Sequence, residues 1–269
     1  MDAAIQIASS IRAEDIRGEI RIVPVANLAG LMSKTMFTVP QDGGKLSGAF
    51  PGCAGGSYTS QLAHLLYREL VEPADIMLEL RGGELVEDMA HYVSVQRTGD
   101  KTYDEKALEL AKVFGCRNII LRKTRTEPNP GESPYAAATF AGKLGMLAEA
   151  GGWGLRRSED VAFLTEGIRN VAAHMGILKD IKPPTNSDKE NVYFESFVDV
   201  FSDAEGFFDC EVAAGDTVKQ GQLLGRIRSF FGETLSELHA EEEGVILGIV
   251  TAAGVTPGTV VIGLGRPMA

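Results

Sequence analysis

The sequence predicts an α/β domain followed by a small all-β domain, and two observations carry this prediction. Over residues 1–181, short apolar runs alternate with amphipathic helical patterns, which is typical of a mostly parallel sheet with helices on both faces. Over residues 192–269, helical periodicity is absent and short β-like runs alternate with glycine turns, as in a small barrel. Residues 182–191 (KPPTNSDKEN) are polar and contain two prolines, so we expect them to link the two domains.

The elements of the first domain follow from local patterns. Apolar or β-branched runs predict strands at residues 20–25, 74–80, 118–121 and 143–148. Apolar residues spaced three and four apart predict helices at residues 1–13, 59–70, 104–114 and 158–175. Thr59 and Ser158 are expected to begin their helices as N-caps, and Gly115 is expected to end the third helix. A long loop is expected over residues 27–56.

Composition excludes several classes of function. The net charge of −11 gives a surface that repels phosphate backbones, so we expect no nucleic-acid partner. Three cysteines without a CxxC motif do not form a disulfide framework. The sequence shows neither a signal-peptide pattern nor an apolar run long enough to span a membrane, so a cytoplasmic protein without membrane contact is expected.

The all-β domain contains a recognisable turn. Residues 215–225 (GDTVKQGQLLG) resemble the turn of biotinyl- and lipoyl-like barrels, in which glycines adopt positive φ. Such domains carry their cofactor on a lysine in a later hairpin, and no lysine follows Lys219. We therefore expect a barrel that serves packing, assembly or coverage of a cleft, and no attached cofactor.

Several motifs of the first domain occur in a characteristic order. They are residues 20–30 (IRIVPVANLAG), 40–43 (PQDG), 50–52 (FPG), 74–83 (ADIMLELRGG) and 146–152 (MLAEAGG). Together they resemble the succinylglutamate desuccinylase/aspartoacylase family of zinc deacylases, over nearly the whole chain. The resemblance implies a zinc carboxypeptidase-like fold and a zinc ion held by an HGxE loop and a later histidine. It also implies a glutamate that moves the proton and an arginine that binds a substrate carboxylate.

The sequence departs from this pattern at its site. The HGxE loop and the first strand would fall before residue 1. The later zinc histidine falls on Arg81, whose guanidinium only donates hydrogen bonds and cannot ligate zinc. The aspartate before that histidine is Glu79, and the carboxylate-binding arginine falls on Gly48. The resemblance places the catalytic glutamate on Glu149, which is retained.

Two hypotheses follow from these departures. In the first, the chain is a degenerate homologue that has no zinc, binds a small anionic amino-acid-like ligand through Arg81 and Glu79, and acts as a binding or partner subunit. In the second, it is an active metal-dependent deacylase of N-acyl amino acids, with zinc as cofactor and Glu149 as general acid/base; an upstream HGxE in the gene would favour it. Glu149 could instead be structural and paired with Arg81. A homo-oligomer, or a pair with a homologous subunit, is expected because a sheet without its first strand exposes an edge.

The histidines give a weaker signal. His64 and His174 lie in predicted helices, where packing explains them. His239 begins an HxxE spacing within the barrel, where a polar edge is the simpler interpretation. His91 is the histidine to consider beside Glu79 and Glu149 if a metal is bound by different ligands.

Overall fold

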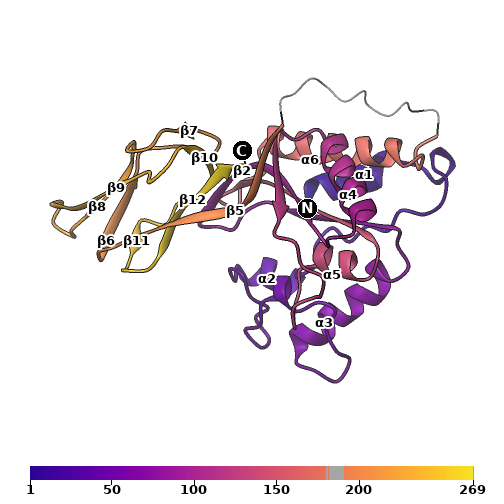
Figure 1. Cartoon of the computed structure of the whole chain (residues 1–269). Helices are drawn as coiled ribbons and strands as arrows, with labels where there is room; N and C mark the ends of the chain where they lie inside the picture. The colour runs from indigo at the N-terminus through magenta and orange to yellow at the C-terminus, as the bar shows by residue number, and fades with distance from the viewer. Residues whose placement is uncertain (180, 182–190, 269) are drawn as a thin grey trace.

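The computed structural model describes residues 1–179, 181 and 191–268 (Figure 1). The linker predicted over residues 182–191 lies outside the described residues except for Asn191, whose side chain donates a hydrogen bond to the carbonyl of Cys116. None of the helices in the described part of the chain combines the length and the apolar character that a membrane span requires.

Helices form where the apolar spacing predicted them, with shifted ends. The described α-helices are α1 Asp2–Ser10, α2 Leu28–Ser33, α3 Tyr58–Leu66, α4 Lys101–Phe114, α5 Pro134–Phe140 and α6 Ser158–His174. Helix α3 begins one residue earlier than predicted because Ser57, rather than Thr59, caps it by accepting from Ser60 N–H. Asp100 likewise starts α4 early, and Gly115 ends it in the left-handed conformation, as predicted. Helix α6 starts at Ser158, but its N-cap is Arg157 and no side chain caps it.

The strands make one large sheet and one small sheet. The large sheet has the order β1-β4-β2-β3-β5-β12-β10-β7, and β10 also pairs with β2. The small sheet has the order β11-β6-β8-β9. The bounds are β1 Ile76–Arg81, β2 Glu87–Gln96, β3 Asn118–Arg122, β4 Leu144–Gly152, β5 Val192–Phe201, β6 Gly206–Cys210, β7 Thr217–Val218, β8 Leu223–Arg228, β9 Thr234–His239, β10 Gly244–Val250, β11 Gly254–Val255 and β12 Val260–Pro267.

The large sheet is mixed, which corrects the expectation of a mostly parallel one. Within the described residues, β1–β4, β2–β3 and β3–β5 are parallel, whereas β2–β4 and every pairing made by β10 or β12 are antiparallel. Two causes explain the difference. The sequence prediction omitted β2, which runs against β4, and the sheet continues past the linker into β5, β12 and β10.

Helices cover both faces of the α/β part, as predicted (Figure 1). Alternate residues of a strand point to opposite faces. On β4, Met146 and Ala148 accordingly join the apolar cluster that includes α4 and α6 residues, whereas Leu147 joins the cluster that includes Tyr135 of α5. Both clusters consist mainly of buried side chains, so the α/β part is stabilised on each side of one sheet.

Residues 20–25 do not form the predicted strand. They are irregular, with a bend at Pro24, and no ladder includes them among the described residues. Strand β1 is at the edge of the large sheet, and residues 20–24 line the same cavity as the whole of β1. A β-branched run forms a strand only when a partner pairs with it, and no described strand lies beside this one.

The residues after the linker form strands and turns, as predicted. The two sheets share one apolar core, with Val218, Leu224, Ile227 and Ile262 fully buried in it. Gly215 and Gly221 of the GDTVKQG turn have φ of 96° and 79°, which explains why glycine occupies both positions. The likeness to a lipoyl-like barrel stays a prediction.

Candidate functional site

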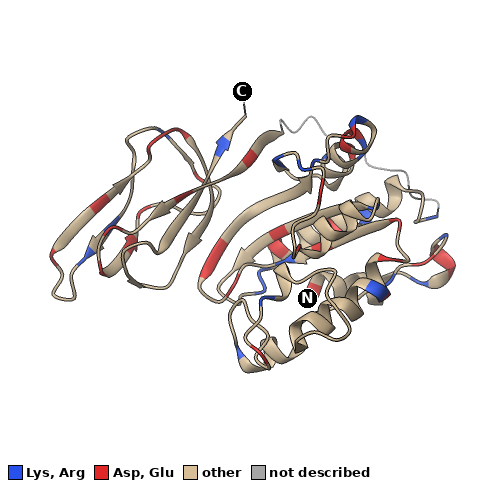
Figure 2. Ribbon diagram, turned by 60° about the horizontal axis from the view of Figure 1, so that its bottom comes forward, with Lys and Arg blue, Asp and Glu red and all other residues tan. Residues whose placement is uncertain are grey.

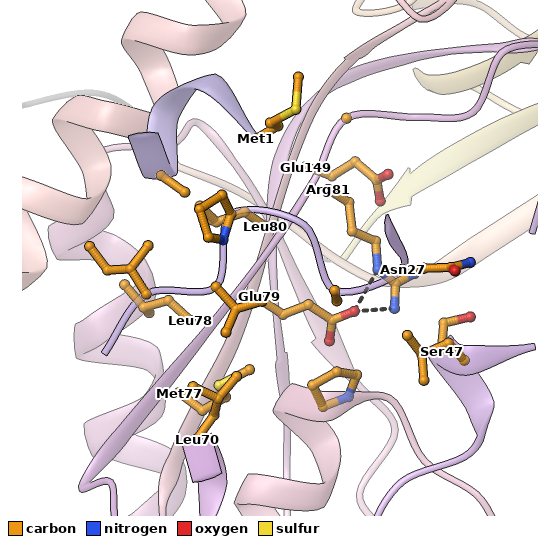
Figure 3. Close-up of a pocket in the computed structure, with 18 of the residues that line it drawn as sticks. Met1, Asn27, Ser47, Leu70, Met77, Leu78, Glu79, Leu80, Arg81 and Glu149 are labelled. Atoms are coloured by element: carbon orange, nitrogen blue, oxygen red, sulfur yellow. Dashed lines mark hydrogen bonds and ion pairs between the residues drawn. The ribbon is translucent and has the colours of Figure 1, made fainter. Parts of the chain in front are cut away.

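A large cavity lies along β1 and under the end of β4 (Figure 3). Its volume is about 1020 Å³, and all residues of β1 line it. Apolar residues make up most of the wall beside Leu78 and Leu80. The polar end is formed by the carboxyl ends of β1 and β4, where Glu79, Arg81 and Glu149 meet. The three residues singled out in the sequence therefore share one cavity.

Arg81 and Glu79 form an ion pair within that cavity. The Nη2 and Nε atoms of Arg81 lie 2.5 and 2.7 Å from the same Glu79 oxygen, Oε1. The other oxygen of Glu79 accepts from the backbone N–H of Tyr135 at 3.2 Å. The two side chains are neighbours on one face because they are two positions apart on a strand, as the sequence predicted. Arg81 therefore pairs with Glu79 and not, as one interpretation had it, with Glu149.

Burial sets the protonation of this pair. Desolvation raises the pKa of Glu79, and the positive charge of Arg81 opposes that rise. Burial by itself would lower the pKa of Arg81, but the negative charges of Glu79 and Glu149 outweigh it and raise that pKa. Arg81 therefore remains a guanidinium and presents its charge to whatever enters the cavity.

Glu149 is buried and held by two donors. The Tyr92 hydroxyl donates to its Oε2 at 2.5 Å, and the backbone N–H of Gly83 donates to its Oε1 at 3.2 Å. Burial, followed by the charge of Glu149, raises the pKa of Tyr92 well above its ordinary value. Tyr92 is thus a neutral phenol that keeps its proton directed at the carboxylate. The contact fixes the orientation of Glu149 at the cavity wall.

Two more carboxylates line the polar end. Burial raises the pKa of both Glu84 and Glu87, and the charge of Glu149 adds to the effect. Glu84 accepts from the backbone N–H of Phe37 at 3.2 Å. Glu87 accepts from the backbone N–H of Glu84 at 3.3 Å. The polar end of the cavity is therefore rich in carboxylates, and Arg81 is the cation paired with Glu79; Arg21 and Lys34 also line the cavity.

The donor set of this cavity does not fit a zinc ion. Zinc sites in proteins use imidazole, thiolate and carboxylate ligands, commonly with three of them from the protein. Here the guanidinium of Arg81 offers only N–H donors, and it occupies Glu79, which could otherwise supply an oxygen. Over residues 1–179, 181 and 191–268, no three His, Cys, Asp or Glu side chains come together in a way that could hold a metal ion.

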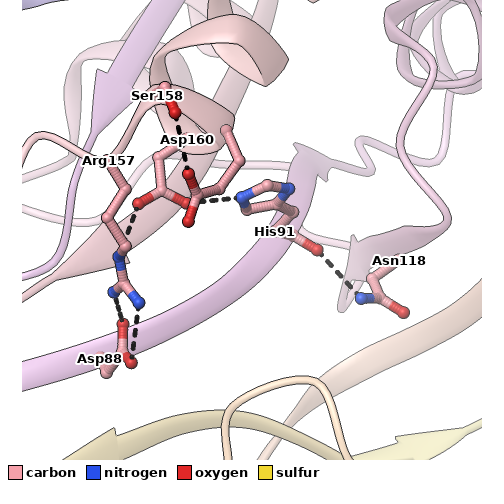
Figure 4. Close-up of polar contacts among 7 residues, drawn as sticks. Asp88, His91, Asn118, Arg157, Ser158 and Asp160 are labelled. Carbon is pink, nitrogen blue, oxygen red and sulfur yellow. Dashed lines mark hydrogen bonds and ion pairs between the residues drawn. The ribbon is translucent and has the colours of Figure 1, made fainter.

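His91 is not among the residues that line the cavity, and it lies beside the start of α6 (Figure 4). Its Nε2 contacts Asp160 Oδ1 of α6 at 2.7 Å, and its ring stacks on Phe163 with centroids 4.3 Å apart. Arg157 joins Asp160 and also pairs with Asp88. Because Tyr92 follows His91 on β2 and contacts Glu149, His91 cannot reach the same site. This network joins α6 to β2, and its residues are partly buried.

The comparisons with known proteins agree with this architecture. The model of the succinylglutamate desuccinylase/aspartoacylase catalytic domain matches residues 3–175. This chain belongs to that family. N-alpha-acetyl-L-2,4-diaminobutyric acid deacetylase from Halomonas elongata is 31% identical over 247 residues, which cover 90% of this chain and 70% of that protein.

Solved structures of the family share the fold. The product-bound ectoine utilization protein EutE (DoeB) from Ruegeria pomeroyi is 26% identical, with a TM-score of 0.86 over 98% of this chain and 80% of that chain. A succinylglutamate desuccinylase/aspartoacylase from Rhodobacter sphaeroides reaches the same TM-score at 22% identity, covering 100% of this chain and 82% of that one. The family's relatives with stated activities are N-acyl amino acid deacylases, so the chain is a homologue of such enzymes.

Sequence reasoning missed three residues of the cavity: Tyr92, Glu84 and Glu87. All three follow from strand β2 and the turn before it, which the sequence prediction left unassigned. An available signal was the alternation over residues 87–96 (EDMAHYVSVQ), which places Tyr92 and Ser94 on one face and Val93 and Val95 on the other.

Proposed function

We propose that this chain is a deacylase homologue that binds an amino-acid-like ligand in the β1 cavity without zinc hydrolysis. The observation that supports it is the Arg81–Glu79 ion pair, which stands where the family resemblance places a zinc-ligating histidine. A fixed guanidinium in a cavity suits a ligand carboxylate, because the planar fork of arginine matches the two carboxylate oxygens. In this hypothesis the arginine contributes binding, and the chain acts as a binding or partner subunit.

The carboxylates of the cavity refine the class of ligand. Glu84 and Glu87 have raised pKa values because they are buried near Glu149, so a cationic group placed between them would relieve their repulsion. The relative from Halomonas elongata is named for an N-acetylated diamino acid. Such a molecule has one carboxylate and one free amine. We therefore propose a ligand with both groups, its carboxylate toward Arg81 and its amine toward the glutamates.

The alternative is an active deacylase, and the position of Glu149 favours it. Glu149 lines the cavity, and Tyr92 and the Gly83 N–H hold its two oxygens. A buried, oriented carboxylate is the kind of group that acts as a general acid/base. In this alternative zinc would be the cofactor, and its ligands would have to include groups beyond those of the described cavity.

One experiment on the purified full chain separates the two hypotheses. Zinc per chain is measured by elemental mass spectrometry, and binding and acetate release are measured with N-acetyl-L-2,4-diaminobutyrate. We expect zinc far below one per chain, saturable binding, and no acetate release. Binding should be lost in Arg81→Met and retained in Arg156→Met, a control that removes one exposed arginine elsewhere. Stoichiometric zinc, together with acetate release that Glu149→Gln abolishes, would establish the alternative.

An assembly is proposed for the same chain. Strand β1 is the edge of the large sheet, and residues 20–24, which line the same cavity, pair with no strand in the described structure. Exposed strand edges attract partners. We propose a homo-oligomer or a pair with a homologous subunit. Light scattering should give a mass above the 28.8 kDa of one chain, and a mass of one chain at all concentrations would contradict it.

A further inference from the structure

A second, smaller pocket lies at the carboxyl ends of β2 and β3. Its volume is about 270 Å³. The first turn of α5 separates it from the β1 cavity, because Pro134 lines that cavity whereas Ser133 and Tyr135 line the smaller pocket. The residues around it are mostly polar and basic: Gln96, Arg122, Lys123, Arg125, Asn129, Glu132, Ser133, Tyr135 and Ala136.

The charges around this pocket do not cancel. Arg125 contacts both oxygens of Glu132, at 2.6 and 3.1 Å, and its guanidinium lies 4.9 Å from the ring centroid of Phe140. That bidentate pair neutralises the one carboxylate in the lining. Arg122 and Lys123 remain as two positive charges. The chain as a whole carries −11, and acidic residues are spread over both of its parts (Figure 2), so a basic pocket stands out from its surroundings.

Arg122 is held in place, but its charge is left without a counter-ion. Its Nε donates to the hydroxyl of Ser94 at 3.3 Å, and its guanidinium carbon lies 5.8 Å from the ring centroid of Phe197. Among the described residues, neither terminal nitrogen of Arg122 has a hydrogen-bond or ion-pair partner. The residue is half-buried. Partial burial of a guanidinium is costly unless acceptors compensate it, so an anion would stabilise this arrangement.

Hydrogen bonds connect the residues that form the walls of the pocket. Gln96 is 3% exposed, and its Nε2 donates to the carbonyls of Arg97 and Lys123 at 2.8 and 2.7 Å. These bonds join the ends of β2 and β3. The hydroxyls of Ser94 and Tyr135 lie 3.4 Å apart and are both buried. A preformed site loses little conformational entropy on binding, which favours affinity for a small ligand.

We propose that Arg122, assisted by Lys123, binds a small oxyanion group in this pocket, either a carboxylate or a phosphate. The two terminal nitrogens of Arg122 supply a planar pair of donors, and Lys123 adds a mobile positive charge at the exposed side. The site is separate from Arg81 and does not depend on the function proposed for the β1 cavity. It would hold the anionic end of a small metabolite.

The test uses the full chain and two probes, inorganic phosphate and acetate, at constant ionic strength adjusted with sodium chloride. Calorimetry measures affinity, and phenylglyoxal labelling followed by mass spectrometry measures the accessibility of Arg122. At least one probe should bind saturably and protect Arg122 from labelling. Arg122→Met should weaken that binding by about tenfold or more, as expected for a lost charge-assisted hydrogen bond. Stronger binding of phosphate than of acetate would assign a phosphate-bearing ligand, and the reverse a carboxylate.

A matched variant shows whether the loss of binding is specific to Arg122. Arg156→Met removes the same charge from an exposed site and should bind the probe as the unmodified chain does. If Arg122→Met does not fold, the labelling of the unmodified chain decides alone. Binding of neither probe, binding unchanged in a folded Arg122→Met, or binding without protection of Arg122 would each overturn the proposal.

Discussion

Replacing Arg81 by methionine tests whether the Arg81–Glu79 pair is a structural part of the cavity. Methionine keeps an unbranched stem of similar length and removes the guanidinium. Glu79 would then lose its contacts at 2.5 and 2.7 Å and keep the Tyr135 N–H at 3.2 Å. The Glu79 side chain is only 10% exposed, so water cannot replace the lost donors fully.

The expected loss of stability follows from this burial. Removing one partner of a buried ion pair costs about 3–5 kcal/mol, because the other charge is left without compensation. The Arg81 side chain is 35% exposed, so solvent already screens part of the interaction. We therefore expect the free energy of unfolding of Arg81→Met to fall by about 2–3 kcal/mol at pH 7.5.

The pH dependence gives a sharper test than the magnitude. Burial raises the pKa of Glu79, and removing Arg81 removes the main positive charge that opposes the rise. With a folded pKa above the unfolded value, the contribution of Glu79 to stability is fully present below the unfolded pKa and is lost as pH rises through the folded pKa. The deficit of Arg81→Met should therefore shrink as the pH is lowered from 7.5 toward 5.

Urea denaturation at both pH values measures the effect, with Glu79→Gln and the double variant completing a cycle. The double variant should be more stable at pH 7.5 than Arg81→Met, because it has no unpaired buried carboxylate. The reasoning fails if Arg81→Met is as stable as the unmodified chain, if its deficit is the same at both pH values, or if the two substitutions are additive.

Two further predictions concern the surroundings of the cavity. Tyr92→Phe removes the 2.5 Å donor to Glu149 and should lower the free energy of unfolding by about 1.5–3 kcal/mol in urea denaturation; an unchanged midpoint would show that Glu149 does not need this bond. Gly167→Ala would place a Cβ 2.1 Å from a ring carbon of Phe114, so tight packing of α6 on α4 predicts a loss of about 1–3 kcal/mol. A neutral or stabilising Gly167→Ala would mean that the two helices separate at little cost.

Much of the fold could be predicted from the sequence because periodicity reports local burial. Helix α4 has its apolar residues three and four positions apart. Gly115 ends it because a residue without a Cβ adopts the left-handed conformation at no steric cost. Strand β4 is an apolar run because both its faces are buried. Residues 20–25 have the composition of a strand, but no described strand pairs with them, so the strand prediction was wrong there. Local sequence cannot report whether a partner strand is present.

Strand β2 shows the opposite failure. Its sequence contains Glu87, Asp88 and His91, which reduced the apolar signal. In the structure these side chains are compensated by long-range partners: Asp88 by Arg157, and His91 by Asp160. Those partners come from α6 and the residue before it, about seventy positions later in the chain. Polar residues within a strand become interpretable only when the fold brings their partners into contact.

The candidate site was predicted in its residues but not in its pairing. The family resemblance drew attention to Glu79, Arg81 and Glu149, and the structure brings all three to one cavity. The resemblance did not predict which carboxylate pairs with Arg81. Glu149 lies opposite Arg81 on the neighbouring strand β4, and Glu79 lies two positions before Arg81 on β1. In the structure Glu149 has other donors, the hydroxyl of Tyr92 from the missed strand and the backbone N–H of Gly83.

The charge at position 81 connects the pairing with the proposed function. A zinc deacylase gathers carboxylates around a dication, and the metal's charge stabilises them. Here four glutamates, Glu79, Glu84, Glu87 and Glu149, surround the guanidinium of Arg81. The charges of Glu79 and Glu149 raise the pKa of Arg81, and the charge of Arg81 opposes the rise in the pKa of Glu84 and Glu87. A single positive charge offsets less repulsion than a dication. Burial is the main cause of the raised pKa values of Glu84 and Glu87, and repulsion from Glu149 adds to it. A ligand amine would supply the remaining positive charge, so Glu87→Gln should weaken binding of N-acetyl-L-2,4-diaminobutyrate more than binding of N-acetyl-L-aspartate, which has no amine to place there.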